Sequence, residues 1–201
     1  MSESAASLPT PVLLLAMPQV LDPFFHRSVV LLVHHEEQGS FGFIVNRPTG
    51  IKVSEILKGM EVAWQGKEDA VAYFGGPVQP QLGTVLFGPA LAGNPVTFEG
   101  EATTEVLSGV SLTQHVGDLS RLAEAPPDRF RLFLGYAGWG AGQLIEEMLR
   151  NDWLTAPVRG DLIFAPDPDL VWAAALASVG VDPAALPLWT PGGGDGEETA
   201  N

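Results

Sequence analysis

The stretch Arg131–Leu144 reads Arg-Leu-Phe-Leu-Gly-Tyr-Ala-Gly-Trp-Gly-Ala-Gly-Gln-Leu. Its first four residues predict a strand, its glycines predict a turn, and apolar residues at i, i+4 spacing predict a helix over 142–151. A glycine-rich turn between a strand and a helix can present backbone N–H groups to an anion. The spacing matches no dinucleotide- or phosphate-binding fingerprint, however. The alternative is that the glycines let Tyr136 and Trp139 pack closely while the chain turns.

Strand signals dominate the chain before this stretch. Early strands are predicted at Val12–Ala16, Ser28–His34 and Ser40–Val45, and further ones at Val71–Phe74, Thr84–Gly88, Val96–Phe98, Val106–Leu112 and Arg131–Leu134. The second and third predict a hairpin, because the segment between them is short and polar and Gly39 can adopt the positive φ that such a loop needs. Pro48 lacks an N–H and is expected to end the third strand at Asn46-Arg47.

Helices are predicted mainly in the second half of the chain. Their spans are Ser54–Met60, Gln114–Ala123 behind Thr113 as N-cap, Gly142–Asn151 and Asp169–Val179, and Asp182-Pro183 begins a short final turn. Because strands joined by short turns come first and helices cluster later, the pattern favours an α+β fold over regular βαβ winding. The 201 residues, 46% of them hydrophobic, suit a single domain, expected over 12–188. The polar or glycine-rich ends, 1–11 and 189–201, are expected to be mobile.

Composition excludes several classes of protein. The 24 Asp and Glu against 10 Lys and Arg give a net charge of -14, which repels nucleic-acid phosphate, so no direct nucleic-acid partner is expected. The lack of cysteine excludes disulfide scaffolds, Cys-ligated zinc, iron–sulfur clusters and a thiol nucleophile. No segment approaches the ~20 consecutive apolar residues that span a bilayer, so no membrane partner is expected either. Without a recognisable signal peptide, the expected location is the cytoplasm.

No pattern in the chain predicts a catalytic residue, a metal or a cofactor. His34-His35-Glu36-Glu37 contains metal-ligand residue types, but neighbours on a strand point to opposite faces, so the two imidazoles could not both reach one ion. Gly109–Thr113 lacks the second glycine of a nucleophile elbow. Glu146 and Glu147 are about 100° apart on a helix, which suits a solvated helix face better than an acid–base pair.

Three strand ends carry the residues of a candidate binding site. Asn46-Arg47 ends one strand, Gly75-Gly76 another, and the predicted Gly135–Trp139 turn a third. If the sheet aligns these ends, one cleft would be lined by Asn46, Arg47, Gly75, Gly76, Tyr136, Gly138, Trp139 and Gln143. Arg47 would be its cation, because a guanidinium offers forked donors to a carboxylate or phosphate. The competing interpretation is that Arg47 pairs with an acidic neighbour and the glycines only turn the chain.

Short motifs also occur in a definite order from about residue 12 to residue 188. They are Ala16-Met17-Pro18, Asp22-Pro23-Phe24-Phe25, Arg27-Ser28-Val29-Val30, His35, Gly42, Asn46-Arg47-Pro48, Gly75-Gly76-Pro77-Val78, Gly135-Tyr136-Ala137-Gly138-Trp139, Gly142-Gln143-Leu144, Glu147 and Asn151-Asp152-Trp153-Leu154. Each motif is modest alone, but the ordered set is specific. It resembles the bacterial AlgH/YqgE family.

The resemblance implies a single cytoplasmic α+β domain, in which a bifurcated, partly barrel-like, mainly antiparallel sheet is surrounded by about four helices. It also implies a role in transcriptional control, with no established reaction. Two functions are therefore open: a non-catalytic regulatory or interaction protein that affects transcription indirectly, and a protein or unrecognised enzyme that binds a small anionic ligand at the glycine turns. A concave site with converging polar groups would favour the second, and a flat, partly apolar surface the first.

Overall fold

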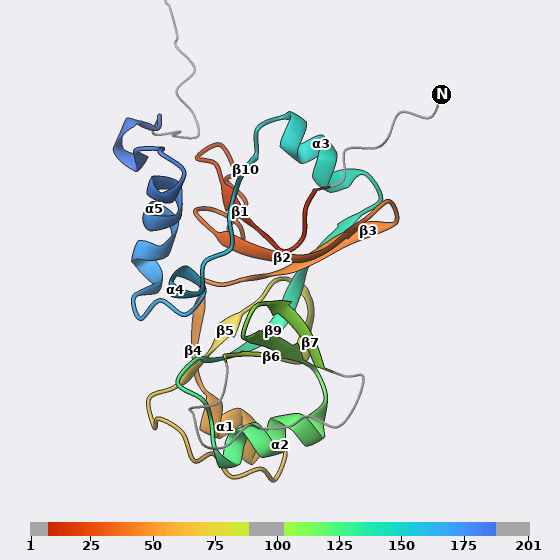
Figure 1. Ribbon diagram of the computed structural model, residues 1–201, viewed down its shortest axis with the longest axis vertical. Helices are drawn as coiled ribbons and strands as arrows, with labels where there is room; N and C mark the ends of the chain where they lie inside the picture. Colours follow the sequence, from red (N-terminus) through yellow and green to blue (C-terminus); the bar gives the residue numbers. More distant parts are fainter. Residues whose placement is uncertain (1–7, 89–102, 188–201) are drawn as a thin grey trace, which may run out of the picture.

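One long strand, β9 (Phe130–Gly140), joins the two halves of the molecule in the computed structural model, which describes residues 8–88 and 103–187. The first part of β9 pairs antiparallel with β6 (Val78–Phe87) and parallel with β5 (Val71–Phe74). Its last part pairs antiparallel with β3 (Gly39–Ile44). The sheet therefore divides along β9 into an upper and a lower half (Figure 1).

The other strands extend the two halves of this sheet. They are β1 (Val12–Ala16), β2 (Val29–Glu36), β4 (Pro48–Lys52), β7 (Thr103–Leu107), β8 (Val110–Thr113) and β10 (Trp153–Ala156). The strand order is β10-β1-β2-β3-β9-β6-β8-β7, and β4 pairs with β5 beside this path. Every pairing except that of β5 with β9 is antiparallel.

In the described part of the chain, five helices surround this curled sheet in a single α+β domain. They are α1 (Val53–Lys58), α2 (Val116–Glu124), α3 (Gln143–Leu149), α4 (Gly160–Ile163) and α5 (Pro168–Ser178), followed by the 3-10 turn η1 (Pro183–Ala185). In Figure 1, α1 and α2 lie at the lower end, α3 lies at the top near β10, and α4 and α5 lie beside the upper strands. None of the helices in the described ranges is long and apolar enough to cross a membrane.

The buried strand β1 lies between two apolar clusters. Leu13 and Leu15 belong to the cluster that includes residues of α4 and α5, whereas Leu14 belongs to the cluster that includes Trp139 and Trp153. A strand buried on both faces reads as a continuous apolar run rather than as an alternating one, which explains Val-Leu-Leu-Leu-Ala. A third cluster packs α1 and α2 against the lower strands.

The buried Arg131 lies where the two halves meet. Its guanidinium lies over the Tyr73 ring, 3.9 Å from the ring centroid, and donates to the carbonyl oxygen of Ala165 at 2.5 Å. Burial lowers the pKa of Arg131, and Tyr73 opposes this shift. The sequence predicts Arg131 only as the start of a strand; the structure shows that it also connects β5, β9 and the link between α4 and α5.

The structure confirms most predicted elements. Strand β1 has the predicted bounds, β2 and β3 form the predicted hairpin, and Gly39 has a φ of 154°. Four predicted helices correspond to α1, α2, α3 and α5, and Asp182 caps η1 by accepting from the Ala184 N–H. Of the residues predicted to be mobile, 1–7 and 189–201 lie outside the described residues, as does the predicted strand Val96–Phe98.

The largest correction concerns the glycines after Leu134. We predicted a turn over Gly135–Trp139, but β9 continues through these residues to Gly140. Gly135 has a φ of 68°, which favours glycine, and another backbone segment packs directly on it: a Cβ at Gly135 would lie 2.4 Å from the Gly76 carbonyl oxygen. The absence of side chains here therefore serves close packing of two backbones.

The structure also differs from the predictions at four smaller points. Strand β3 ends before Pro48 as predicted, but Pro48 begins the unpredicted edge strand β4, a position where its missing N–H costs no ladder bond. The single strand predicted over 106–112 is the β7–β8 hairpin, turned at Gly109 with φ 74°. Helix α2 is capped at His115 instead of Thr113, whose hydroxyl accepts from the His115 N–H. Finally, the short helix α4 was not predicted.

Candidate functional site

Asn46 and Arg47 hold the chain around residues 26–29. The Asn46 side chain is buried; its Oδ1 accepts from the Val29 N–H at 2.9 Å, and its Nδ2 donates to the Arg27 carbonyl at 3.0 Å. Arg47 donates to the carbonyl oxygen of His26. Neither the predicted acidic partner of Arg47 nor a ligand is needed to explain these contacts, which tie the end of β3 to the start of β2.

Gly75 and Gly76 pack against the middle of β9. The Gly75 N–H donates to the Leu134 carbonyl at 2.9 Å, and a Cβ at Gly76 would lie 2.1 Å from the Tyr136 carbonyl carbon. Tyr136 itself is half-buried and makes an edge-on ring contact with Phe41, with centroids 6.1 Å apart. All three residues therefore take part in packing.

The remaining three predicted residues, Gly138, Trp139 and Gln143, line one cleft of about 370 Å³. We call it the Trp139–Trp153 cleft. Its walls come from the end of β9, from α3, from the start of β10 and from the segment 19–25. The other lining residues are Gln19, Val20, Leu21, Asp22, Phe25, Glu147, Arg150, Asp152 and Trp153.

Glu147 organises this cleft. Its Oε2 accepts from the indole Nε1 of Trp139 and from that of Trp153, both at 2.8 Å. Its Oε1 accepts from Nε2 of Gln143 at 2.9 Å, and Oε1 of Gln143 accepts from the Gly140 N–H at 3.1 Å. One carboxylate on α3 thus joins the last residues of β9 to the first residue of β10. These bonds hold α3 to the ends of both strands.

Three aromatic rings lie together behind this network. Trp139 and Trp153 meet edge-on with centroids 5.8 Å apart, and Phe25 meets Trp153 at the same distance and Trp139 at 6.3 Å. Such edge-to-face pairs add to the stability that burial alone provides. The helix α3, the two strand ends and the segment 19–25 are consequently held as one unit.

Acidic groups outnumber basic groups in the cleft. Asp22, Glu147 and Asp152 line it together with one cation, Arg150. Arg150 is paired with Asp152, with 3.0 Å between Nη2 and Oδ2. Asp22 accepts from the N–H of Phe24 at 2.8 Å through Oδ1 and so fixes the turn that carries Phe25.

Sequence reasoning about single motifs missed the residues that organise this cleft. Glu147 was interpreted as part of a solvated helix face, yet it lies one helical turn after Gln143, and that i, i+4 spacing is a signal for a shared contact. Trp153 and Asp22 entered only through the family resemblance. The contact between Trp153 and Trp139 depends on the tertiary fold, because β1, β2 and β3 separate β10 from β9 in the sheet.

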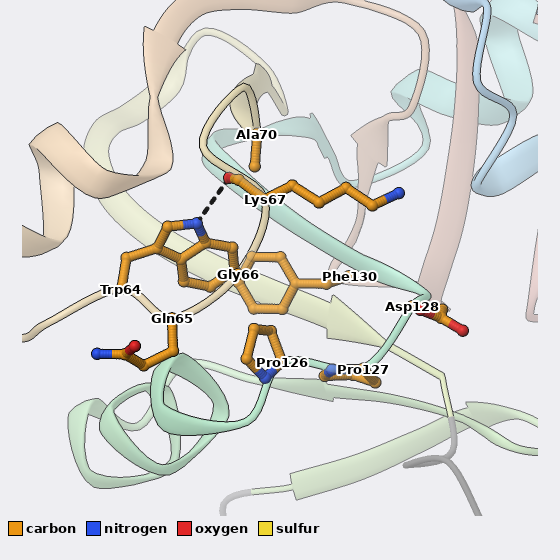
Figure 2. Close-up of a pocket in the computed structure, with 9 residues that line it drawn as sticks. All are labelled: Trp64, Gln65, Gly66, Lys67, Ala70, Pro126, Pro127, Asp128 and Phe130. Atoms are coloured by element: carbon orange, nitrogen blue, oxygen red, sulfur yellow. Dashed lines mark hydrogen bonds between the residues drawn. The ribbon is translucent and has the colours of Figure 1, made fainter.

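Two further cavities have less convergent chemistry. A cleft of about 500 Å³ is lined by the 64–67 loop and by Ala70, Pro126, Pro127, Asp128 and Phe130. Figure 2 shows Trp64, Gly66, Pro126 and Phe130 grouped, while the polar ends of Gln65 and Asp128 point away from them. The indole Nε1 of Trp64 donates to the Lys67 carbonyl oxygen at 2.9 Å. A mostly apolar pocket of about 260 Å³ lies between α1 and α2.

Within residues 8–88 and 103–187, no group of three His, Asp or Glu side chains could hold a metal ion. His34 stacks on Phe41, with centroids 5.4 Å apart, whereas His35 contacts the Ser40 hydroxyl through Nδ1 at 2.7 Å. The two imidazoles thus have separate partners.

Comparison with other proteins places this arrangement among known sequences and folds. Residues 13–184 match a family model described as AlgH-like. The chain is 38% identical to a UPF0301 protein of Myxococcus xanthus over 88% of this chain and 93% of that protein. It resembles the solution structure of the AlgH protein from Pseudomonas aeruginosa with TM-score 0.70 and 33% identity, over 90% and 94% of the two chains. A Corynebacterium diphtheriae protein with TM-score 0.68 and 22% identity shares the fold over 94% and 93%.

Proposed function

This chain belongs to the AlgH-like family, and from that membership together with the geometry of its cleft we propose that it is a non-catalytic interaction protein that receives part of a partner in the Trp139–Trp153 cleft. Its place of action would be the cytoplasm. Any effect on transcription would be indirect, through that partner, because a net charge of -14 disfavours contact with DNA.

The observation that carries this proposal is the combination of a concave, polar centre with an apolar rim. Polar side chains from three elements and the segment 19–25 converge on about 370 Å³, which is the property expected of a binding site. Leu21, which lines the cleft, is 37% exposed, and Phe24 on the same segment is 47% exposed. Exposed apolar side chains beside a cleft are typical of a surface that docks another molecule.

We propose that the cleft is not catalytic because of the hydrogen bonds that Glu147 already makes. A general acid or base needs access to a substrate proton, but both oxygens of Glu147 already accept N–H donors from the protein. The carboxylate is therefore bound to the scaffold, and we assign it a positioning role.

A thermal-shift screen tests the proposal. We would compare wild type with Leu21→Trp, which fills the cleft, and with Leu170→Trp, the same substitution at a position on α5 that is 62% exposed. A peptide or metabolite that stabilises wild type and Leu170→Trp, but not Leu21→Trp, would support binding in the cleft. At about 100 times its Kd such a ligand adds about 2.7 kcal/mol of stability. Equal shifts in all three proteins, no shift with any compound, or chemical conversion of the ligand would contradict the proposal.

A second candidate function is the binding of a small anion, favoured by the exposed guanidinium of Arg150 in the same cleft. Arg150→Gln would abolish the thermal shift caused by an anionic ligand. Arg47 is no longer the best cation for such a ligand, because it donates to the His26 carbonyl. Arg47→Ala is accordingly expected to lower the melting temperature of the free protein and to leave ligand-induced shifts unchanged.

A further inference from the structure

We infer that the group received by the Trp139–Trp153 cleft is a basic side chain, a guanidinium or ammonium group, carried by a partner polypeptide. This inference rests on the proposed function and specifies the chemistry of its ligand. It follows from the balance of hydrogen-bond donors and acceptors, from the net charge of the lining, and from the apolar rim.

Most side-chain donor groups of the cleft already have an acceptor within the protein; in the described residues Nη1 of Arg150 is one that has none. Both indole N–H groups and the Gln143 amide donate to Glu147. The Gln19 amide donates to the Asn151 carbonyl. Nε of Arg150 donates to Asp152 at 3.1 Å. An incoming anion would find no positive charge in the lining except that of Arg150, which is already paired with Asp152.

Two carboxylate oxygens of the cleft, by contrast, accept no hydrogen bond from the described residues. A carboxylate offers about four lone-pair sites. Asp22 uses Oδ1 for two backbone N–H groups, those of Phe24 and Phe25, and Asp152 uses Oδ2 for Arg150. Among donors in the described parts of the chain, none reaches Oδ2 of Asp22 or Oδ1 of Asp152 within hydrogen-bond distance. A ligand that brings donors, and not acceptors, completes the cleft.

Charge and aromatic content point in the same direction. Three carboxylates against one guanidinium leave the lining with two excess negative charges, on a protein whose net charge is -14. Phe25, Trp139 and Trp153 line the same space, and aromatic rings attract ammonium and guanidinium groups through their negative faces. The chain uses this contact within its own fold, where Arg131 lies over Tyr73.

The rim indicates that the basic group is part of a polypeptide. Phe24 stacks on Phe74, with centroids 5.5 Å apart, and together with Leu21 it adds exposed apolar surface beside the cleft. A free inorganic or small organic cation would have no contact with this surface. A basic residue flanked by further chain would cover it, as in interfaces where a charged or aromatic anchor enters a pocket surrounded by near-neutral contacts.

The test uses short peptides and the indole N–H signals of the full chain in ¹H–¹⁵N NMR spectra. The probes are acetylated and amidated Gly-Gly-X-Gly-Gly peptides with X as Arg, Lys, Glu or Leu. We expect the Arg and Lys peptides to shift the signals of Trp139 and Trp153 in a saturable way, and the Glu and Leu peptides to leave them unchanged. The affinity should decrease with added salt, because the carboxylates involved are partly exposed.

Two variants test whether the cleft binds a positively charged group. Arg150→Gln releases Asp152 and should strengthen binding of the Arg peptide severalfold. The double variant Asp22→Asn with Asp152→Asn keeps the shape of the lining but removes two charges, and should weaken binding about fivefold or more. Leu170→Trp is the control that should bind as wild type does.

Each contrary result has a distinct meaning. Saturable binding of the Glu peptide or inorganic phosphate that is lost in Arg150→Gln would overturn the cation inference while retaining a binding function for the cleft. Binding of methylguanidine as tight as that of the Arg peptide would overturn the assignment to a polypeptide. Unchanged indole signals with every probe would overturn the cation inference; a compound found in the thermal-shift screen would then still support the cleft as a binding site.

Discussion

Buried polar side chains are few among the described residues, and all but one have a hydrogen-bond partner. The buried set is Ser28, Ser40, Asn46, Thr84, Thr113, Asp118 and Arg131. Ser28 is the exception: it is 0% exposed, and its hydroxyl has no partner within the described ranges. Burying a hydroxyl without a hydrogen bond costs about 1–3 kcal/mol.

Ser28→Ala is therefore expected to leave the free energy of unfolding unchanged or to raise it, which is unusual for a fully buried position. Urea unfolding monitored by tryptophan fluorescence measures this directly. Thr113→Val is the contrasting variant, because the Thr113 hydroxyl donates to Asp118 at 2.8 Å. We expect it to lower stability by about 1–3 kcal/mol. A Ser28→Ala loss as large as that of Thr113→Val would show that the Ser28 hydroxyl has a partner.

Gly76 is expected to be the glycine most sensitive to substitution. Gly76→Ala would place a Cβ 2.1 Å from backbone atoms of Tyr136, which cannot move without disturbing β9. We expect a loss of well over 1 kcal/mol. Gly180→Ala is the matched control: its φ is 78° and no atom lies within 4 Å of the new Cβ, so only the backbone strain of about 1 kcal/mol applies. Equal losses in the two variants would contradict the close-approach explanation.

Among the elements, the strands and helices with strong local signals were predictable from the sequence, as was the first part of β9, but its continuation through Gly135–Gly140 was not. β1, the β2–β3 hairpin and α5 have local signals strong enough to define them. The glycines of β9 locally favour a turn, but the packing of Gly75-Gly76 on them and the pairing with β3 keep them in the strand. The same limit applies to the cleft. Trp139 and Gln143 were predicted as candidate residues. Glu147 was not, because it accepts from Trp139 and Trp153, and the local sequence does not show that β9 extends to Trp139.

Helix α3 is expected to depend on Glu147 for its attachment. Glu147→Ala removes the acceptor of two indole N–H groups and one amide, and bonds to a charged acceptor contribute about 1.5–3 kcal/mol. We expect a stability loss in that range, together with faster hydrogen exchange of the α3 amides. Glu146→Ala, an exposed neighbour on the same helix, should change neither quantity by much. Similar exchange rates in both variants would contradict the attachment.

For the whole molecule, charge is the property that determines which partners can approach. The net charge of -14 is spread over a chain with only ten Lys and Arg, and the cleft is itself acidic. Long-range attraction therefore speeds the approach of basic partners and slows that of acidic ones, with a range of about 8–10 Å at physiological salt.

Purified protein is accordingly expected to show no tight binding to duplex DNA near physiological ionic strength. Affinity for DNA comes largely from Lys and Arg contacts that release counterions, and this chain has few such residues. A mobility-shift titration with salt varied between about 50 and 200 mM measures it. A sub-micromolar, sequence-dependent complex would contradict both this expectation and the proposal of indirect action on transcription.

The pairing of β1 with β10 also determines when the chain can fold during synthesis. Leu13 pairs with Ala156, so the first strand waits for its outer partner until nearly the whole domain has left the ribosome. At about 5–20 residues per second that interval is roughly 7–29 s, during which the apolar run Val12–Ala16 lacks the neighbour that covers its outer edge. Translation speed and chaperone access thus bear on the yield of this protein, and early termination before β10 would release a chain with an uncovered, aggregation-prone strand.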